Sequence, residues 1–416
     1  MKKIIYPSEI SGKINAPPSK SFMQRGIAGA ILSDGETNIS GPSLSEDSLA
    51  ALDIARKFGR VVHNNFDSIT IDKKTFPINS DFNCGESGLS LRMFAPIAAL
   101  EKSQITLRGQ DSLLGRTISM IEAPLKNLGV KCFTNNGFPP ITVQGPMTGG
   151  EIFIDGSVSS QFLTGLLFAL PTVNSDSIIH VKNLSSRPYI DMTIEVIKKF
   201  GVNIENQNYE TFIIKGNQKY KCNNFQVEKD WSGASFFFVA AAIAGTITIS
   251  GLDLQSTQGD KIIIETLINA GAYIEQNAHD ITVSKQTLRP FTIDLTDTPD
   301  LFPPLVVLAL FCPGKSIIKG VKRLRSKESD RGEILLREFS SEEKQLIIRD
   351  DIMEIIGNDS LMKGRTINPQ NDHRIAMAGA IAALRSENGF SIESSNCVNK
   401  SYPSFFEHLD QITSKK

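Results

Sequence analysis

The chain has 416 residues, 40% of them hydrophobic and 21% charged, a composition typical of a globular protein large enough for two domains. Its formal net charge of −1 argues against a general nucleic-acid binder, which would carry a basic excess. No apolar run reaches the ~20 residues of a membrane span or forms a signal peptide, and the five scattered cysteines lack zinc or disulfide spacing, so we expect a cytoplasmic protein without disulfides or a zinc site.

A repeated pattern begins near residue 55. In four segments an amphipathic helix ends at a glycine and two short alternating strands follow. These glycines, spaced by 70, 72 and 70 residues, are Gly59, Gly129, Gly201 and Gly271. A glycine just past a helix end adopts the left-handed backbone that closes the helix. The pattern predicts α/β units, and about six of them fit the length of the chain.

The last two units depart from this pattern. The fifth keeps its helix but has no glycine near residue 341, and residues 340–363 lack the strand pattern. The sixth has no strand pair after its last helix, residues 405–412, so we expect the N-terminal strands to complete it. The sequence therefore predicts one domain of residues 15–228 and a second of residues 1–14 with 229–416, each with three units.

Polar residues gather where predicted strands give way to helices, first in residues 16–25. Either Ser19 or Ser21 can cap a helix there, and Lys20 and Arg25 lie near its N-terminal end. Exposed amides with two cations form an anion site. The alternative is an ordinary capped surface helix.

Two glycine-containing loops follow. Gly88 opens a predicted helix over residues 89–100, and a glycine there lets a ligand approach the backbone closely, although an ordinary turn would look the same. In residues 111–117, Arg116 follows a glycine, a pattern that is usually a solvated loop.

Residues 155–164 place three hydroxyls and an amide at the start of an apolar helix, which is costly unless a polar group binds there. A second serine pair precedes residues 187–191. Farther along, Asp300 leads directly into the most apolar helix, residues 301–310, where its alternative role is that of an N-cap.

The densest charges lie in residues 323–331. A helix starting near Ser326 would put Lys327 and Arg331 on one face, with Glu328 about a third of a turn away. Like charges at that spacing are unfavourable without an anion between them. Each charged loop alone is usually a solvated face, but these segments recur at corresponding places in the repeats, as do residues 371–377 and 399–403.

Five of these segments resemble motifs of the 5-enolpyruvylshikimate 3-phosphate synthase family, in the family order and over nearly the whole chain. They are Pro18–Ser21 with Arg25, Gly156–Thr164, Arg187–Asp191, Lys327–Arg331 and Asp372–Met377. The resemblance implies a two-domain inside-out α/β barrel of six βαβαββ repeats, with the substrates held between the domains. It also implies transfer of the enolpyruvyl group of phosphoenolpyruvate to shikimate 3-phosphate, without metal or organic cofactor. The family leads us to expect a monomer.

The resemblance also assigns site residues, with residues 15–228 as the shikimate 3-phosphate side. For shikimate 3-phosphate these are Lys20, Ser21, Arg25, Ser159, Ser160, Gln161, Ser186, Tyr189, Asp300, Arg323 and Lys327. For phosphoenolpyruvate they are Lys20, Gly88, Arg116, Gln161, Arg331, Arg374 and Lys400. The expected catalytic groups are Asp300 as base and Glu328 as acid, assisted by Lys20 and Lys327.

The chain departs from the family pattern at several positions. Glu86 stands where the family usually has asparagine, Leu89 where threonine is common, and Arg323 where asparagine is usual. Gly88 predicts sensitivity to glyphosate. A transferase acting on UDP-N-acetylglucosamine is the nearest alternative, but the cysteine of its loop is missing from residues 111–117. A non-catalytic binding protein would have lost ionisable site residues, which are present, and an RNA-end-processing enzyme would need a basic excess.

Overall fold

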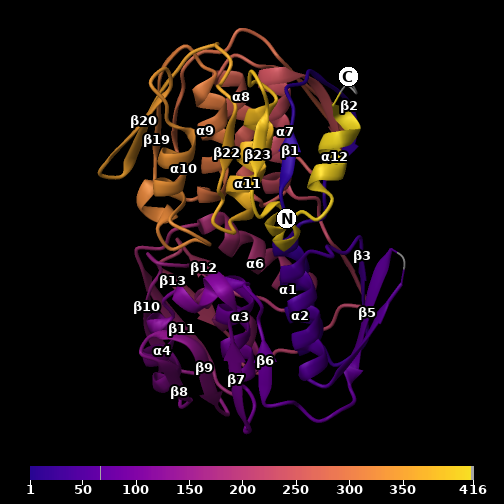
Figure 1. Ribbon diagram of the computed structural model, residues 1–416. Coiled ribbons are helices and arrows are strands. Elements are labelled where there is room, and N and C mark those ends of the chain that lie inside the picture. The colour runs from indigo at the N-terminus through magenta and orange to yellow at the C-terminus, as the bar shows by residue number, and fades with distance from the viewer. Residues whose placement is uncertain (66, 414–416) are drawn as a thin grey trace. The chain divides into compact units, whose positions relative to one another are not determined.

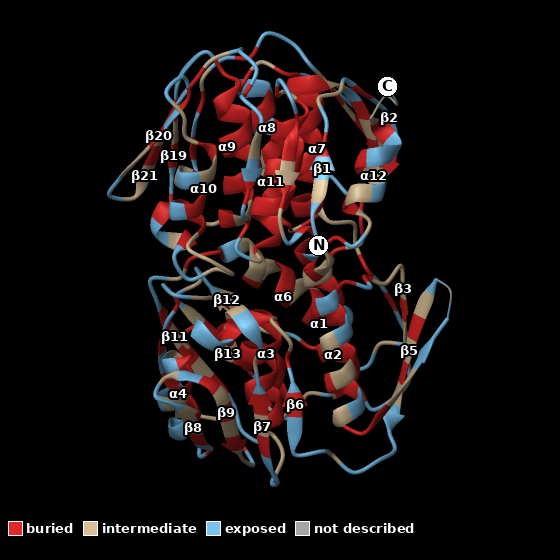
Figure 2. Ribbon diagram, in the orientation of Figure 1, coloured by how far each residue is buried: buried red, intermediate tan, exposed pale blue. Residues whose placement is uncertain are grey.

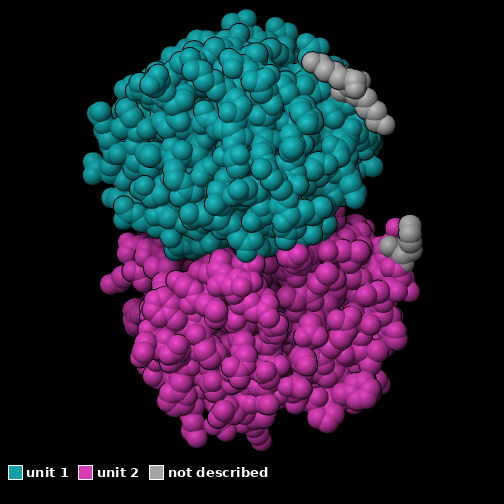
Figure 3. Space-filling model, in the orientation of Figure 1, with its two compact units in different colours: residues 1–17, 229–416 teal, residues 18–228 magenta. Residues whose placement is uncertain are grey.

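The computed structural model describes residues 1–65 and 67–413. The chain divides into two compact units: unit 1 has residues 1–17 and 229–416, and unit 2 has residues 18–228 (Figure 3). Within the described chain, each unit contains three β-sheets with helices packed on them (Figure 1). These six sheets correspond to the six predicted α/β units.

The three sheets of unit 2 share one strand order. In each, two neighbouring strands are parallel, and two further strands continue the sheet in antiparallel fashion. The sheets are β14 (Asn224–Gln226), β3 (Thr37–Ser40), β5 (Ser68–Lys74), β4 (Arg60–Asn64); β6 (Asp81–Asn83), β7 (Gln104–Arg108), β9 (Phe138–Gln144), β8 (Lys131–Asn135); and β10 (Glu151–Asp155), β11 (Ser177–Lys182), β13 (Thr211–Ile214), β12 (Glu205–Gln207).

Two kinds of helix connect these strands. The helices α1 (Lys20–Leu32), α3 (Gly88–Ala98) and α5 (Gln161–Ala169) are buried along most of their length, as expected of apolar core helices. The outer, more polar helices are α2 (Glu46–Lys57), α4 (Glu122–Asn127) and α6 (Arg187–Lys199). Short 3-10 helices are η1 (Asp111–Gly115), η2 (Ser119–Ile121) and η3 (Leu170–Thr172). Helices α3 and α5 pack directly on each other.

Unit 1 repeats this arrangement. Its sheets are β2 (Ile10–Asn15), β15 (Gly245–Ser250), β17 (Asp280–Ser284), β16 (Tyr273–Gln276); β18 (Thr292–Asp294), β19 (Gly314–Lys319), β21 (Ile352–Gly357), β20 (Gln345–Arg349); and β22 (Arg365–Ile367), β23 (Phe390–Ile392), β1 (Lys3–Ile5). Its helices are α7 (Trp231–Ala244), η4 (Gly259–Ile262), α8 (Ile263–Asn269), η5 (Pro299–Leu301), α9 (Phe302–Leu310), η6 (Val321–Leu324), α10 (Arg331–Phe339), α11 (His373–Ala383), η7 (Ser395–Lys400) and α12 (Phe405–Ile412).

The core of unit 1 lies around three helices that pack on one another, α7, α9 and α11. Every residue of these helices is buried, and Figure 2 shows them red. Their sequences are mostly apolar, with polar residues near the N-terminal ends of α7 and α11, so most of their surface requires packing against neighbouring elements.

The glycine caps are confirmed. The four glycines that define the repeat each lie just past a helix end and have positive φ angles of 82°, 79°, 82° and 92° at Gly59, Gly129, Gly201 and Gly271. In this left-handed region other residues are strained. The sequence period therefore reports a real structural repeat.

The fifth repeat has its strand pair within residues 345–357, although residues 340–363 lack the usual sequence pattern. Strands β20 and β21 pair from Gln345 with Ile356 to Arg349 with Ile352. In place of a glycine cap, Lys344 anchors the turn: its Nζ donates to the carbonyl oxygens of Leu310 (2.7 Å) and Asn358 (2.6 Å). The buried ammonium group of Lys344 thus binds the last carbonyl oxygen of α9 and stabilises a repeat that has no glycine cap.

The N-terminus completes the sixth repeat with one strand. Strand β1 pairs antiparallel with β23, whereas β2 pairs in parallel with β15 and is the first strand of the fourth repeat. In unit 2, β14 at the end of the segment likewise supplies the first strand of the first repeat beside β3. Each unit therefore closes with a strand distant in sequence.

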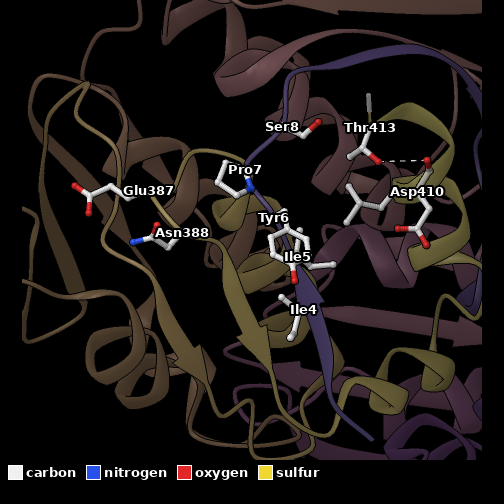
Figure 4. A pocket seen from close by; sticks show the side chains of 10 residues that line it. Ile4, Ile5, Tyr6, Pro7, Ser8, Glu387, Asn388, Asp410 and Thr413 are labelled. Atoms are coloured by element: carbon white, nitrogen blue, oxygen red, sulfur yellow. Dashed lines mark hydrogen bonds between the residues drawn. The ribbon is translucent and has the colours of Figure 1, made fainter. Parts of the chain in front are cut away.

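A surface cavity of about 570 Å³ lies in unit 1 between β1 and α12, lined by residues that include Tyr6, Glu387 and Asp410 (Figure 4). None of its lining residues is a predicted site residue. No helix within residues 1–65 and 67–413 is both long and apolar enough to cross a membrane.

Candidate active site

The N-terminal end of α1 carries the first predicted cation. Ser19 caps the helix, because its Oγ accepts from the amide of Phe22 (3.4 Å). Lys20 begins the helix, and its Nζ lies 2.7 Å from Oδ2 of Asp47 on α2. Both side chains are largely buried, so an anionic ligand at this helix end would compete with Asp47 for Lys20.

The second and third loops meet at Gly88, the first residue of α3. A Cβ built on Gly88 would lie 3.1 Å from Arg116 Nη1 and 3.4 Å from Gln161 Oε1. The structure therefore brings together three residues predicted for phosphoenolpyruvate. The helix end here is capped by Ser87, whose Oγ accepts from the amide of Ser90 (3.2 Å).

Arg92 belongs to this cluster but was not selected from the sequence. It is buried, and its Nη1 donates to Gln161 Oε1 (2.8 Å) while Nη2 donates to the carbonyl oxygen of Thr117 (3.0 Å). A Cβ on Gly88 would lie 2.8 Å from Arg92 Nη1. The available signal was its position four residues after Gly88, which places both on one helix face.

The predicted serines lie at the starts of α5 and α6. Ser159 Oγ accepts from the amide of Gln161 (3.1 Å), and the buried Ser160 precedes the first residue of α5. Ser186, also buried, precedes α6 with a φ of 60°, a left-handed angle that is strained for serine. Ser185 holds this turn by donating to the carbonyl oxygen of Gly156 (3.1 Å).

Arg25 joins two helices of unit 2. It is buried, and it donates to Thr193 Oγ1 (2.9 Å) and to the carbonyl oxygens of Ser21 (3.0 Å) and Tyr189 (3.2 Å). Burial lowers the pKa of Arg25 to about 10, although Tyr189 opposes the shift. Arg25, Ser21 and Tyr189 thus lie together. Three nitrogens of Arg25 already donate hydrogen bonds to oxygen atoms of the protein.

The predicted base, Asp300, lies in η5 of unit 1 among three cations. Its Oδ1 accepts from Arg331 Nη1 (2.9 Å) and lies 3.5 Å from Lys327 Nζ, and its Oδ2 accepts from Arg374 Nη2 (3.0 Å). Asp300 is not at a cap position, because the N-cap residues are Thr298 for η5 and Leu301 for α9. Four predicted residues from three segments therefore form one cluster.

Helix α10 begins at Arg331 rather than near Ser326, which corrects the predicted helix start. Asp330 caps it by accepting from the amide of Glu333 (3.3 Å), so Lys327 and Glu328 lie in the preceding turn. Lys327 and Arg331 nevertheless meet at a carboxylate, and Arg331 also pairs with Glu328.

Asp372 is a second residue that the sequence analysis did not select. Its Oδ2 accepts from Arg331 Nε (2.8 Å) and Ser329 Oγ (3.1 Å), and its Oδ1 caps α11 at the amide of Arg374 (2.9 Å). It is fully buried. Its signal was that of an N-cap before an apolar helix, and the cap also orients two predicted arginines.

Two further predicted residues lie close by. Lys400 Nζ donates to the carbonyl oxygen of Asn371 (2.7 Å), the residue before Asp372. Arg323, in η6, is electrostatically coupled to Asp297 and Asp300, which raise its pKa against a larger lowering by burial. All the predicted residues of unit 1 thus lie in or beside one ion cluster.

The cluster perturbs its members strongly. Burial raises the pKa of Asp300, but Arg374, Lys327 and Arg331 together outweigh it, so the pKa of this carboxyl falls well below its usual range. Burial lowers the pKa of Lys327, and Asp300 opposes the shift. Such perturbed groups, held together in a buried cluster, are typical of active sites.

Comparison with known proteins identifies the family. The model of the family described as EPSP synthase (3-phosphoshikimate 1-carboxyvinyltransferase) matches residues 5–409. The chain belongs to this family. A 3-phosphoshikimate 1-carboxyvinyltransferase of Clostridium novyi is 38% identical over 98% of this chain and 96% of the relative, and one of Methanocorpusculum labreanum is 37% identical over 99% and 98%.

Solved structures agree with the family's fold. The EPSP synthase of Acinetobacter baumannii superposes with a TM-score of 0.83 at 26% identity, covering 99% of this chain and 98% of that one. The enolpyruvyl transferase NikO of Streptomyces tendae, at 14% identity and a TM-score of 0.78, covers 99% and 97% and shares the fold. The predicted fold class and family are confirmed, and the chain is an enolpyruvyl transferase of the shikimate pathway.

Proposed function

We propose that this chain transfers the enolpyruvyl group of phosphoenolpyruvate to the 5-hydroxyl of shikimate 3-phosphate and releases phosphate through a tetrahedral intermediate. The observation that carries the mechanism is Asp300, a partly buried carboxylate held by Lys327, Arg331 and Arg374. Both substrates are multiply charged anions that repel each other. Cations close to both are needed to offset this repulsion.

The two sets of side chains divide the work of binding. For shikimate 3-phosphate we assign residues mainly of unit 2, with contributions from unit 1: Lys20, Ser21, Arg25, Ser159, Ser160, Gln161, Ser186, Tyr189, Asp300, Arg323 and Lys327. For phosphoenolpyruvate we assign Lys20, Gly88, Arg116, Gln161, Arg331, Arg374 and Lys400. The clusters at Gly88 and at Asp300 support this assignment. The first gathers arginines at a helix end, and the second gathers them beside one partly buried carboxylate.

Anion binding would activate the base. While three cations hold Asp300, its pKa is too low for it to accept a proton readily. An anionic substrate that draws Arg331 and Arg374 toward itself weakens their hold on Asp300 and raises the pKa of that carboxyl. Asp300 then takes the proton of the 5-hydroxyl, assisted by Lys20.

The remaining groups act on the enol and on the leaving phosphate. Glu328 protonates the methylene carbon of the enolpyruvyl group, with Lys327 beside it, and is itself held by Arg331. Lys400 and the arginines stabilise the charge on phosphate as it leaves the intermediate. No metal or organic cofactor takes part in this scheme, so turnover should persist in excess EDTA.

Phosphate release from phosphoenolpyruvate tests the proposal. We expect turnover with shikimate 3-phosphate and none with UDP-N-acetylglucosamine as acceptor. Asp300→Ala should lower kcat by at least ~100-fold, the usual scale for a general base. The matched control Asp294→Asn changes an exposed aspartate in the same unit and should turn over normally. Normal turnover of Asp300→Ala would remove Asp300 from the role of base.

Three further properties belong to the same proposal. Inhibition by glyphosate is expected from Gly88, and a purified enzyme that withstands millimolar glyphosate would contradict it. We also propose that the enzyme works as a monomer in the cytoplasm. Sedimentation equilibrium and cell fractionation measure these two properties directly.

A further inference from the structure

Glu86 is linked to Arg116 through the side chain of Ser112. Oε2 of Glu86 accepts from the amide nitrogen of Ser112 (3.2 Å) and from Ser112 Oγ (2.6 Å). The same Ser112 Oγ accepts from Arg116 Nη2 (3.1 Å). A hydroxyl can donate and accept at once, so the carboxylate fixes the hydroxyl in the orientation that receives Arg116.

The fold explains why these loops meet. Strands β6 and β7 are parallel neighbours, so the loops after them leave the same edge of the sheet. The amide of Gln110 donates to the carbonyl oxygen of Gly85 (2.8 Å), and Asp111 has a φ of 43°, an angle that costs a non-glycine residue roughly 1–2 kcal/mol. A loop with this strain requires anchoring contacts, and Glu86 supplies two of them.

The carboxylate also has an electrostatic effect. Arg116 Nη2 faces Ser112, while its Nη1 would lie 3.1 Å from a Cβ on Gly88, at the N-terminal end of α3. An anion bound at that helix end would therefore lie near Arg116, whose Nη2 is linked through Ser112 to the charge of Glu86. Positioning of Arg116 favours the anion, whereas the negative charge of Glu86 opposes it.

We propose that Glu86 is a positioning residue that sets the affinity of the site for phosphoenolpyruvate: it holds Arg116 through Ser112, and its charge limits how tightly the anion binds. The inference rests on the proposed function of Arg116. Glu86 stands where the family usually has asparagine, so the charge at this position is a departure of this chain from the family pattern.

Two substitutions at one position separate the two effects. Glu86→Gln keeps an oxygen that accepts from Ser112 and removes the charge, so KM for phosphoenolpyruvate should fall by about 3- to 10-fold. Glu86→Ala removes the anchor, so the same KM should rise by about 10-fold, and Ser112→Ala should shift it in the same direction. We expect kcat to stay within about two-fold in Glu86→Gln, since no reacting group is changed.

Salt dependence adds a readout that a purely structural role would not move. The difference in KM between Glu86→Gln and the unchanged enzyme should narrow as KCl rises from about 0.05 M to about 0.5 M, because salt screens the charge. The matched control Glu36→Gln removes an exposed carboxylate beyond the other end of α1 and should leave both KM values unchanged. Circular dichroism confirms that each variant is folded.

The outcomes separate this inference from the proposed function. Shifts of KM in the same direction for Glu86→Gln and Glu86→Ala, or equal shifts of KM for shikimate 3-phosphate, would overturn the role of Glu86. The proposed function would survive that result if Arg116→Ala still raised KM for phosphoenolpyruvate. An Arg116→Ala variant with unchanged KM would overturn the binding role of Arg116 and the inference with it.

Discussion

Asp260, in η4 of unit 1, is a buried carboxyl group near the proposed base. Its Oδ1 has no hydrogen-bond partner among the described residues. The pKa of Asp260 is raised to about 7, first by burial and then by the charges of Asp300 and Asp230, while Arg374 and Ser232 oppose the shift. The folded protein therefore binds a proton here more tightly than the unfolded chain does.

This shift makes stability depend on pH. Because the folded pKa lies above the unfolded value of 3.8, the contribution of Asp260 is complete below the unfolded pKa and is lost as pH rises through about 7. Asp260→Asn removes the titrating group and therefore that loss. The free energy of unfolding of the variant, minus that of the unchanged enzyme, should increase by roughly 2 kcal/mol from pH 5 to pH 8.

Urea unfolding at the two pH values measures this difference. Asp34→Asn, at an exposed position of unit 2, serves as the control and should show no such change. A difference between Asp260→Asn and the unchanged enzyme that is the same at pH 5 and pH 8 would contradict the assignment.

Sequence reasoning found the charged residues that stand at helix starts, such as Lys20 and Arg374, because capping and charge patterns are local. It did not find Arg92 or Asp372, whose partners Gln161 and Arg331 lie 69 and 41 positions away. Nothing local marks a side chain as the partner of a distant one. Glu86 was noticed only as a departure from the family, and its link to Ser112 required the folded loops.

At the scale of elements, the glycine period was the most informative pattern. Each of these glycines is needed for the same reason, the left-handed backbone just past a helix end. The same criterion failed in the fifth repeat, where Ser340 is extended and Lys344 provides the anchor through backbone oxygens of Leu310 and Asn358. Strands β20 and β21 form there because their turn has a left-handed residue, Asp350, with a φ of 54°.

Two glycine caps with the same backbone angle should respond differently to substitution. Gly201 and Gly59 both have a φ of 82°, but a Cβ on Gly201 finds its nearest neighbour at 3.8 Å, whereas one on Gly59 would lie 2.1 Å from the carbonyl oxygen of Phe76. Gly201→Ala should therefore cost about 1 kcal/mol from left-handed strain alone. Gly59→Ala should cost roughly 3 kcal/mol or more, because the backbone must also move.

The urea midpoints of the two alanine variants, compared with that of the unchanged enzyme, test this expectation. Gly201→Ala is the matched control for Gly59→Ala, since both lose the same glycine freedom. Equal losses of stability would mean that the backbone at Phe76 moves away from the added Cβ at no cost in free energy.

At the scale of the whole molecule, the units differ in how their chain is arranged. Unit 2 is continuous and contains β14, the strand that begins its first repeat. Unit 1 needs β1 and β2 from residues 1–17 as well as residues 229–416. The returning N-terminus was predictable because the sixth repeat lacked strands, but the membership of β2 in the fourth repeat was not.

This arrangement predicts which fragments fold. Residues 18–228 expressed alone should give a cooperative thermal transition. Residues 229–416 alone should not, because two sheets would each lack a strand. Joining residues 1–17 through a flexible linker after residue 416 should restore a cooperative transition. Circular dichroism measures all three, and a cooperative melt of residues 229–416 by themselves would contradict the requirement for β1 and β2.

The separation of β2 from β15 also bears on how the protein is made. On the ribosome, β2 emerges early, but the strand it pairs with follows only after all of unit 2 has been synthesised. Unit 2 can fold during translation, since domains fold as they emerge. Strand β2 meanwhile has an unpaired edge, a state that favours chaperone binding until β15 leaves the exit tunnel.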